Sequence, residues 1–222
     1  MDYSHMKPQE VRQLIRNGEI KTFTSGMCQG YAQANLVILP KELAFDFLLF
    51  TQRNPKPCPV LDVTEVGNPE PRLAAPGADL RTDIPKYRIY KKGQFVEEVD
   101  DITTYWRNDL VAFLLGCSFS FEGPLLDAGL EVRHITENHN VPMYITNIRC
   151  VPAGVFNGPI VVSMRPMTPK NAIRATQVTS RMPSVHGAPL HIGDPSAIGI
   201  KDINKPEFGD PSTIKPGEVP VF

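Results

Sequence analysis

Residues 34–53 read ANLVILPKELAFDFLLFTQR and contain the longest apolar runs of the chain. The first part, ANLVILP, is typical of a buried strand that ends at Pro40. In the second part, Leu43, Phe47 and Phe50 recur at helical spacing and predict a helix with one apolar face. A strand that runs directly into a helix favours a fold that mixes the two kinds of element.

The flanking sequence extends this pattern in both directions. Apolar periodicity predicts helices over 8–18, 100–115, 120–132 and 168–182, the last with Thr168 as its cap and Pro169 in its first turn. Short apolar runs predict strands within 55–66, 141–148 and 158–166, and a Lys-Gly-Gln turn predicts a hairpin over 87–99. Because a hairpin interrupts the alternation, a mixed α/β architecture is favoured over a purely parallel wound sheet.

Composition excludes several classes of protein. The 222 residues carry a formal charge of −1 without a basic block, so the usual signature of a nucleic-acid or membrane-surface protein is lacking. No apolar run reaches the roughly 18–20 residues that span a bilayer, and the polar N-terminal segment is not a secretory signal. The cysteines are widely spaced and form no C-x-x-C pair, which favours reduced thiols and a cytoplasmic location: Cys28, Cys58, Cys117 and Cys150.

A first polar stretch, TSGMCQGYAQAN at residues 24–35, has the features of a ligand-binding loop. Gly26 and Gly30 let the backbone approach a ligand closely. Neutral donors and acceptors are offered by Thr24, Ser25, Tyr31, Gln33 and Asn35. It matches neither a Walker loop nor a dinucleotide fingerprint, and a purely structural turn is the alternative.

A second stretch, LLGCSFSFEGPLLDAGL at residues 114–130, joins two predicted helices. The backbone amides of Cys117 and Ser118 could bind an anion there, joined by the side chains of Ser118, Ser120 and Glu122. The alternative is that the serines only cap a helix. A nucleophilic Cys117 would need an activating base that the sequence does not locate.

The third stretch, RMPSVHGAPLHIGDP at residues 181–195, contains His186 and His191. We expect one of these histidines to act as a general acid or base while Arg181 or Arg165 holds a substrate carboxylate. A divalent metal bound by His186, His191 and Asp194 is one alternative, and a rigid proline turn is another. Our hypothesis is a loop that presents Arg181, His186, His191 and Asp194 to a cleft shared with residues 24–35 and 116–122.

These motifs, in their order along the chain, resemble the YcsI-like hydro-lyase family. The resemblance rests on GYAQANLVILP, QRNPKPCPVLDV, DLRTDIPKYRIY, FLLGCSFSFEGPLLDAGL and RMPSVHGAPLHIGDPSAIGIKDINKPEFGD, and it runs from about residue 7 to the end. Relatives of the family include the N-terminal portion of mitochondrial D-glutamate cyclase. Chains of the family normally continue a little beyond GEVPVF, so either a truncated C-terminus or a last segment outside the printed sequence is expected.

The resemblance implies an α/β fold with a three-layer αβα main part and a smaller two-layer α+β part. We expect residues 1–222 to form one unit, with the smaller part near 75–160. The implied reaction is loss of water from a small amino or carboxylic acid, D-glutamate cyclisation to 5-oxo-D-proline being one candidate. Such a site needs a cation for the α-carboxylate, oxyanion donors and a proton shuttle.

Within that reaction, Arg181 or Arg165 suits the carboxylate, and the Cys117 and Ser118 amides suit the oxyanion. His186, His191 or Glu122 suits the proton shuttle. The Arg81–Asp83 pair could contribute, although a solvated loop pair is the alternative. No cofactor is expected, and the expected partners are a small carboxylate or amino acid and a second copy of the chain, not nucleic acid or membrane. The rival hypothesis is a non-catalytic module that binds small carboxylates.

Overall fold

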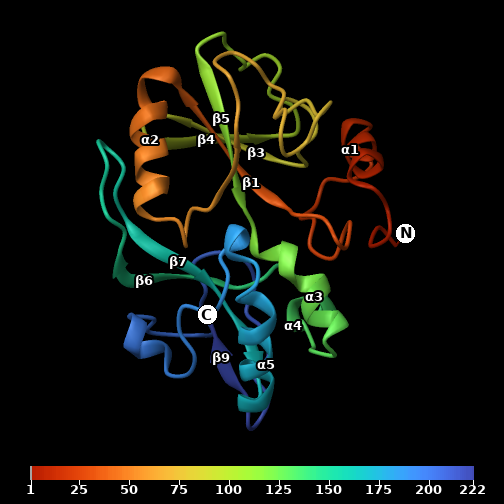
Figure 1. The fold of residues 1–222 in the computed structure, drawn as a ribbon, viewed down its shortest axis with the longest axis vertical. Coiled ribbons are helices and arrows are strands. Elements are labelled where there is room, and N and C mark those ends of the chain that lie inside the picture. Colours follow the sequence, from red (N-terminus) through yellow and green to blue (C-terminus); the bar gives the residue numbers. More distant parts are fainter. Residues whose placement is uncertain (1) are drawn as a thin grey trace.

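The computed structural model describes residues 2–222, which form small antiparallel sheets connected by short helices and long loops (Figure 1). The α-helices are α1 (Pro8–Arg16), α2 (Lys41–Arg53), α3 (Glu122–Asp127), α4 (Arg133–Thr136) and α5 (Pro169–Thr179). The strands are β1 (Ala34–Pro40), β2 (Val60–Val63), β3 (Tyr87–Lys91), β4 (Gln94–Val99), β5 (Leu110–Gly116), β6 (Met143–Arg149), β7 (Pro159–Ser163), β8 (Arg165–Met167) and β9 (Val219–Val221). The predicted mixed α/β class is confirmed.

The stretch that begins at Ala34 folds as expected into strand β1 and helix α2. Pro40 ends the strand and serves as the N-cap residue of the helix. Phe47 and Phe50 are buried against the sheet, and the Phe47 ring meets Phe113 edge-on with 4.9 Å between centroids. The helix therefore covers one face of the sheet with the apolar stripe that its sequence shows.

The prediction of a helix over residues 100–115 is wrong. Residues 110–116 form β5, the middle strand of a three-stranded sheet in the order β1–β5–β2. Leu110 to Leu114 are all buried, because α2 covers one face of this strand while Leu80 and its neighbours from the loop before β3 cover the other. A strand buried on both faces loses the two-residue alternation, so its apolar run cannot be told from a helix by periodicity.

Among residues 2–222, the three-stranded sheet has a helix on one face only, whereas the resemblance implied helical layers on both faces. Its second face is covered by the irregular segment that contains Leu80 and Ile84, where the prediction placed another helical layer. Strand β5 lies within the expected 75–160 part, yet it pairs with β1 and β2 from outside that range. The sheet therefore crosses the boundary expected near residue 75.

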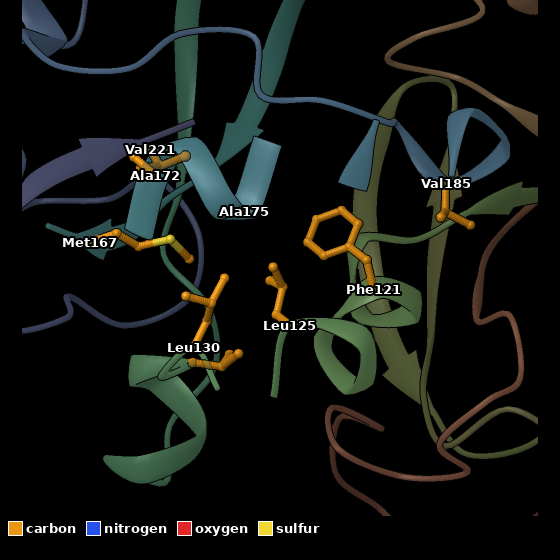
Figure 2. Packing of buried hydrophobic residues seen from close by; sticks show 9 residues of the cluster. Phe121, Leu125, Leu130, Met167, Ala172, Ala175, Val185 and Val221 are labelled. Carbon is orange, nitrogen blue, oxygen red and sulfur yellow. The ribbon is translucent and has the colours of Figure 1, made fainter. Parts of the chain in front are cut away.

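The elements that follow β5 in the chain gather at the other end of the molecule (Figure 1). The β6–β7 hairpin and the antiparallel pair β8–β9 lie there with α3, α4 and α5. Figure 2 shows the core that joins them, in which Phe121 and Leu125 face Ala175 of α5 and Met167 of β8. Thr168 caps α5 as predicted, since its side chain accepts a hydrogen bond from the Asn171 amide. This core fixes the two elements, α3 and β8, that supply the charged groups of the site.

Candidate functional site

The end of β5 is the point where the three polar stretches meet. Cys117 donates its amide proton to the Gln33 carbonyl oxygen (2.9 Å), and the Ser120 hydroxyl accepts a bond from the Gln33 amide (2.8 Å). A Cβ on Gly116 would collide with the Ser184 carbonyl oxygen, so a glycine is needed for the loop at 183–188 to lie against the strand. The structure thus brings residues 24–35, 116–122 and 183–188 together.

A buried charged cluster lies just beyond this junction. Glu122 of α3 accepts hydrogen bonds at Oε1 from Arg165 Nη2 (2.8 Å) and from His134 Nε2 (2.7 Å). The Ser25 hydroxyl donates to Glu122 Oε2 (2.7 Å). The Glu122 and His134 side chains are each only 1% exposed, and that of Arg165 is 6% exposed. The carboxylate therefore joins three segments that are far apart in sequence.

The charge states of the cluster follow from burial and from these contacts. Burial raises the pKa of Glu122, but the His134 hydrogen bond and the Arg165 charge outweigh this effect and lower the pKa below its ordinary value. Burial lowers the pKa of His134, and the Arg165 charge lowers it further against the opposing effect of Glu122. At neutral pH the cluster therefore holds a carboxylate, a guanidinium and a neutral imidazole whose proton is on Nε2.

Two buried nitrogens of this cluster lack a hydrogen-bond partner among residues 2–222: His134 Nδ1 and Arg165 Nε. The other Arg165 nitrogens bond Ser163 Oγ (3.0 Å), Ser118 Oγ (3.3 Å) and Glu122. The Arg165 guanidinium also lies 5.0 Å from the centroid of the Phe121 ring, which belongs to the core of Figure 2. Buried polar atoms without partners are uncommon and mark this cluster as a candidate functional site.

Arg165 connects the cluster to a large cleft of about 1780 Å³. The wall near Arg165 also contains Ser118, Cys117, Asn35 and His186. Glu122 and His134 lie behind this wall and not on it. A ligand in the cleft would therefore meet the guanidinium, while the carboxylate and imidazole act on that ligand through Arg165.

His186, which lines the cleft, has an unusual backbone conformation. Its φ of 81° lies in the left-handed region, which is strained for a residue with a side chain. Its Nδ1 donates to the Lys56 carbonyl oxygen (2.9 Å), so the neutral ring carries a lone pair on Nε2, which has no hydrogen-bond partner among residues 2–222. Burial lowers the pKa of His186, and the charges of Lys56 and Arg165 add to this effect, whereas the hydrogen bond to the Lys56 carbonyl opposes it. The result is a neutral imidazole suited to accept a proton.

The structure separates the residues of the 181–195 stretch. His186 lines the cleft, whereas Arg181, His191 and Asp194 are not among its lining residues. His191 Nε2 donates to the Asp194 carbonyl oxygen (2.8 Å), and its ring stacks on Phe222. The Asp194 carboxylate caps the 3-10 helix Pro195–Ile198 through Ser196. The hypothesis of one loop presenting all four residues to the cleft is therefore wrong for three of them.

The other predicted site residues divide in the same way. Those that line the cleft are Tyr31, Gln33, Asn35, Asp83, Cys117, Ser118 and Arg165. Ser120 is buried, and its hydroxyl accepts a hydrogen bond from the Gln33 amide. The Cys117 amide already donates to the Gln33 carbonyl oxygen and therefore cannot donate to an oxyanion. Burial raises the pKa of the Cys117 thiol, which disfavours the thiolate that a nucleophile requires.

The expected Arg81–Asp83 pair is not formed. Asp83 is buried and binds Arg16 and Arg12 of α1, so it anchors that helix to the loop before β3. Arg81 pairs instead with Asp79 (2.7 Å). The alternative prediction, a solvated loop pair of Arg81 and Asp83, is therefore also wrong, because Asp83 is buried and bonded to α1.

The described part of the chain contains no group of three or more His, Cys, Asp or Glu side chains that could hold a metal ion. His186, His191 and Asp194 are thus not arranged as a metal site. Within residues 2–222, no helix is both long and apolar enough to cross a membrane.

Sequence reasoning missed two residues of the site, Lys56 and His134. His134 lies on α4, a single helical turn whose four residues give no periodic signal. Lys56 lies in a proline-rich turn, 130 positions before His186. The signal that could have drawn attention to His134 is a histidine followed closely by a second, His139, in an otherwise polar segment.

Comparison of the sequence with known proteins assigns the chain to a family. Residues 111–222, which include Glu122, His134, Arg165 and His186, match the family model described as D-glutamate cyclase. The chain belongs to the D-glutamate cyclase family. Its resemblance to the YcsI-like hydro-lyases is thereby confirmed.

Relatives in this family align over nearly the whole chain. The chain is 66% identical over 222 residues to a "Putative hydro-lyase" of Thermoanaerobacter sp. (strain X514) and 65% identical over 222 residues to one of Psychrobacter arcticus; each alignment covers 100% of this chain and 84% of the relative. It is also 65% identical over 217 residues to "Putative hydro-lyase YcsI" of Bacillus subtilis (strain 168), covering 98% and 84% of the two chains.

Proposed function

We propose that this member of the D-glutamate cyclase family is a lyase that removes water from a small amino or carboxylic acid. Its leading reaction is the cyclisation of D-glutamate to 5-oxo-D-proline. The observation that carries the proposal is that Arg165 and His186, from separate segments, line one cleft. They offer an oriented cation and a neutral imidazole, which are the two groups that such a reaction needs.

The reaction forms one bond and breaks another without a net change in protons. The amine nitrogen bonds to the side-chain carboxyl carbon, and one C–O bond of that carboxyl breaks. The ammonium gives up two protons, which leave with the departing oxygen as water. No oxidant or reductant is required, so the chemistry is positioning of the two ends of the molecule and transfer of protons.

Arg165 has the properties of the α-carboxylate anchor. Its guanidinium is held from behind by Glu122 and by the Phe121 ring. Ser118, which lies on the same wall of the cleft, is a neutral donor beside it. A carboxylate bound here meets an already fixed cation, so little ordering is needed when the substrate binds.

His186 has the properties of the proton shuttle. The bond from Nδ1 to the Lys56 carbonyl fixes the tautomer and leaves the Nε2 lone pair as the acceptor. In the proposed step, Nε2 takes a proton from the substrate ammonium, which frees the amine to attack, and returns it to the departing oxygen. After the C–N bond has formed, Nε2 carries the second proton from nitrogen to the same oxygen, which leaves as water. Glu122 and His134 do not touch the substrate in this scheme and act as positioning residues for Arg165.

The test is a chiral chromatographic assay for 5-oxoproline formed from D-glutamate and from L-glutamate, with and without added divalent metal. His186→Asn should lower turnover of D-glutamate about 10²–10⁴-fold, the usual contribution of a general acid or base. The matched control is His191→Asn, because His191 lies outside the cleft.

A second pair of variants tests the carboxylate anchor. Arg165→Lys keeps the charge but loses the two-pronged geometry, so we expect a higher KM for D-glutamate, whereas Arg181→Lys should behave as the parent chain. If the unsubstituted chain forms no 5-oxoproline yet its Tm rises with glutarate, the lyase proposal fails and a carboxylate-binding module takes its place.

A further inference from the structure

The cations that line the cleft are not equivalent. Several are neutralised by a neighbouring carboxylate: Arg12 by Asp83, Lys21 and Lys86 by Asp100, Arg88 by Glu98, Arg107 by Asp109 and Arg165 by Glu122. Lys91 and Lys92 are exposed at the turn between β3 and β4. Lys56 is half-buried and forms no salt bridge with any residue of the described chain 2–222. It therefore adds a positive charge to the cleft that no protein carboxylate balances.

The Lys56 ammonium is held in place by backbone carbonyl groups. It donates to the His186 carbonyl oxygen (3.0 Å) and to the Ala188 carbonyl oxygen. In return, the His186 ring donates to the Lys56 carbonyl oxygen, so the two residues clamp their segments together. An ammonium has three N–H donors, and the two carbonyl bonds leave one of them for a ligand.

Lys56 also lies close to the candidate proton shuttle. The clamp joins it directly to His186, whose ring feels the charges of both Lys56 and Arg165. Burial lowers the pKa of Lys56, so an anion in the cleft would stabilise its charged form. The wall of the cleft therefore offers the Arg165 guanidinium, which is paired with Glu122, and the Lys56 ammonium, which has no carboxylate partner within residues 2–222, and the charges of both act on the His186 ring.

We propose that Lys56 is the second anion-binding residue of this cleft, and that the cleft selects molecules with a carboxylate at each end. The inference rests on the proposed function only in using the same cleft, with Arg165 at the first carboxylate. Lys56 then binds the carboxylate at the other end, the one whose oxygen leaves in the proposed reaction. A fixed cation at that carboxylate stabilises the negative charge that develops on its oxygens when the amine attacks.

The test compares two ligands that differ only at one end. Glutarate has two carboxylates, and glutaramate replaces one of them by a neutral amide of nearly the same shape. Isothermal titration of the unsubstituted chain should give at least about tenfold tighter binding of glutarate, as expected for one charge-assisted hydrogen bond. Equal affinity for the two ligands would overturn the proposal without any variant.

Substitution then assigns the preference to Lys56. Lys56→Gln keeps a donor for a carbonyl while removing the charge, and we expect it to bring glutarate affinity down to that of glutaramate. Lys56→Arg should restore the preference in part, and Lys170→Met, at an exposed position outside the cleft, should leave it unchanged. If Lys56→Gln weakens both ligands equally, Lys56 is only a clamp for the loop at 186–188 and the proposal is overturned.

The outcome is separable from that of the proposed function. A glutarate preference that depends on Lys56, together with absence of 5-oxoproline, would support this inference and refute the lyase activity. Formation of 5-oxoproline with an unchanged glutarate preference in Lys56→Gln would do the reverse.

Discussion

Two neighbouring residues of the short helix α4 enter two different charged clusters. Arg133 binds Glu131 and Glu218 with its guanidinium and also donates to the Thr213 carbonyl, so each of its side-chain nitrogens has a partner. His134, the next residue, bonds Glu122 through Nε2 and leaves Nδ1 without a partner. The first cluster ties the C-terminal segment to the rest of the molecule, whereas the second reaches the cleft through Arg165.

The two clusters differ in whether all their buried polar atoms have hydrogen-bond partners, and differ less in charge or burial. Arg133 and His134 are both almost fully buried, and both bind glutamates. A cluster in which every buried donor is paired stabilises the fold, and one with unpaired atoms beside a cleft has capacity left for a ligand. The Arg133 cluster is therefore assigned to the scaffold and the Glu122 cluster to the site.

The largest effect that tests this assignment is expected from Glu122→Gln. The substitution removes the counter-charge of a nearly buried guanidinium, which should lower the free energy of unfolding by about 3 kcal/mol. Urea denaturation measures this loss. Glu218→Gln, in the other cluster, should cost less because Arg133 keeps Glu131 as a partner. Equal losses in the two variants would mean that the clusters play the same role.

Arg133→Met is expected to have the next largest effect. It removes the shared partner of Glu131 and Glu218, and we expect a loss of about 2 kcal/mol, since one of these glutamates is partly exposed and can be rehydrated. Glutarate binding by the folded variant should match that of the parent chain in isothermal titration. Weakened binding would show that the Arg133 cluster also shapes the cleft.

The two clusters should also respond to acid in different pH ranges. The folded-state pKa of His134 is lowered, so its neutral form contributes stability that is present above pH 6.5 and is lost as pH falls toward the folded-state pKa. The pKa of Glu131 is lowered to about 2, chiefly by its bond from Arg133, so its contribution is lost only between about pH 4.5 and 2.

Urea unfolding at a series of pH values distinguishes these contributions. His134→Gln should flatten the dependence of stability on pH below 6.5, and Glu131→Gln should leave that range unchanged. An unaltered slope in His134→Gln would show that His134 titrates normally in the folded chain.

The smallest effect is expected at the rim of the Arg133 cluster. Lys215 contacts Glu131 at 3.3 Å, and both side chains are largely exposed. Lys215→Met should therefore change the free energy of unfolding by about 0.5 kcal/mol or less. A loss as large as that of Arg133→Met would mean that the exposed pair is part of the scaffold.

Much of the local structure could be predicted from sequence because it depends on neighbouring residues. The strand at 34–40, the helix after it and the capped helix α5 carry periodicity, prolines and a capping threonine within a single window. Strand β5 could not be predicted in this way, because its apolar run reflects burial by two distant segments.

The candidate site was predictable only in part for the same reason. Glu122, Ser118 and His186 were identified by residue type and by their glycine-rich surroundings, and Arg165 by residue type alone. The structure places all four in or beside one cleft. His191 and Asp194 have equally suitable side chains, but the His191 ring bonds the Asp194 carbonyl oxygen and stacks on Phe222, and the Asp194 carboxylate bonds Ser196. Nothing in their spacing indicates which of two nearby histidines faces a cleft.

The sequence by itself determined the α/β class, most of the elements and the segments from which the site is built, because these depend on local preferences and side-chain chemistry. Only the tertiary structure decided that His134 lies behind Arg165 and that Lys56 clamps His186, since each contact joins segments separated along the chain. It also decided which polar atoms are left unpaired. That property depends on burial by the whole fold, and it is what distinguishes the Glu122 cluster from the Arg133 cluster.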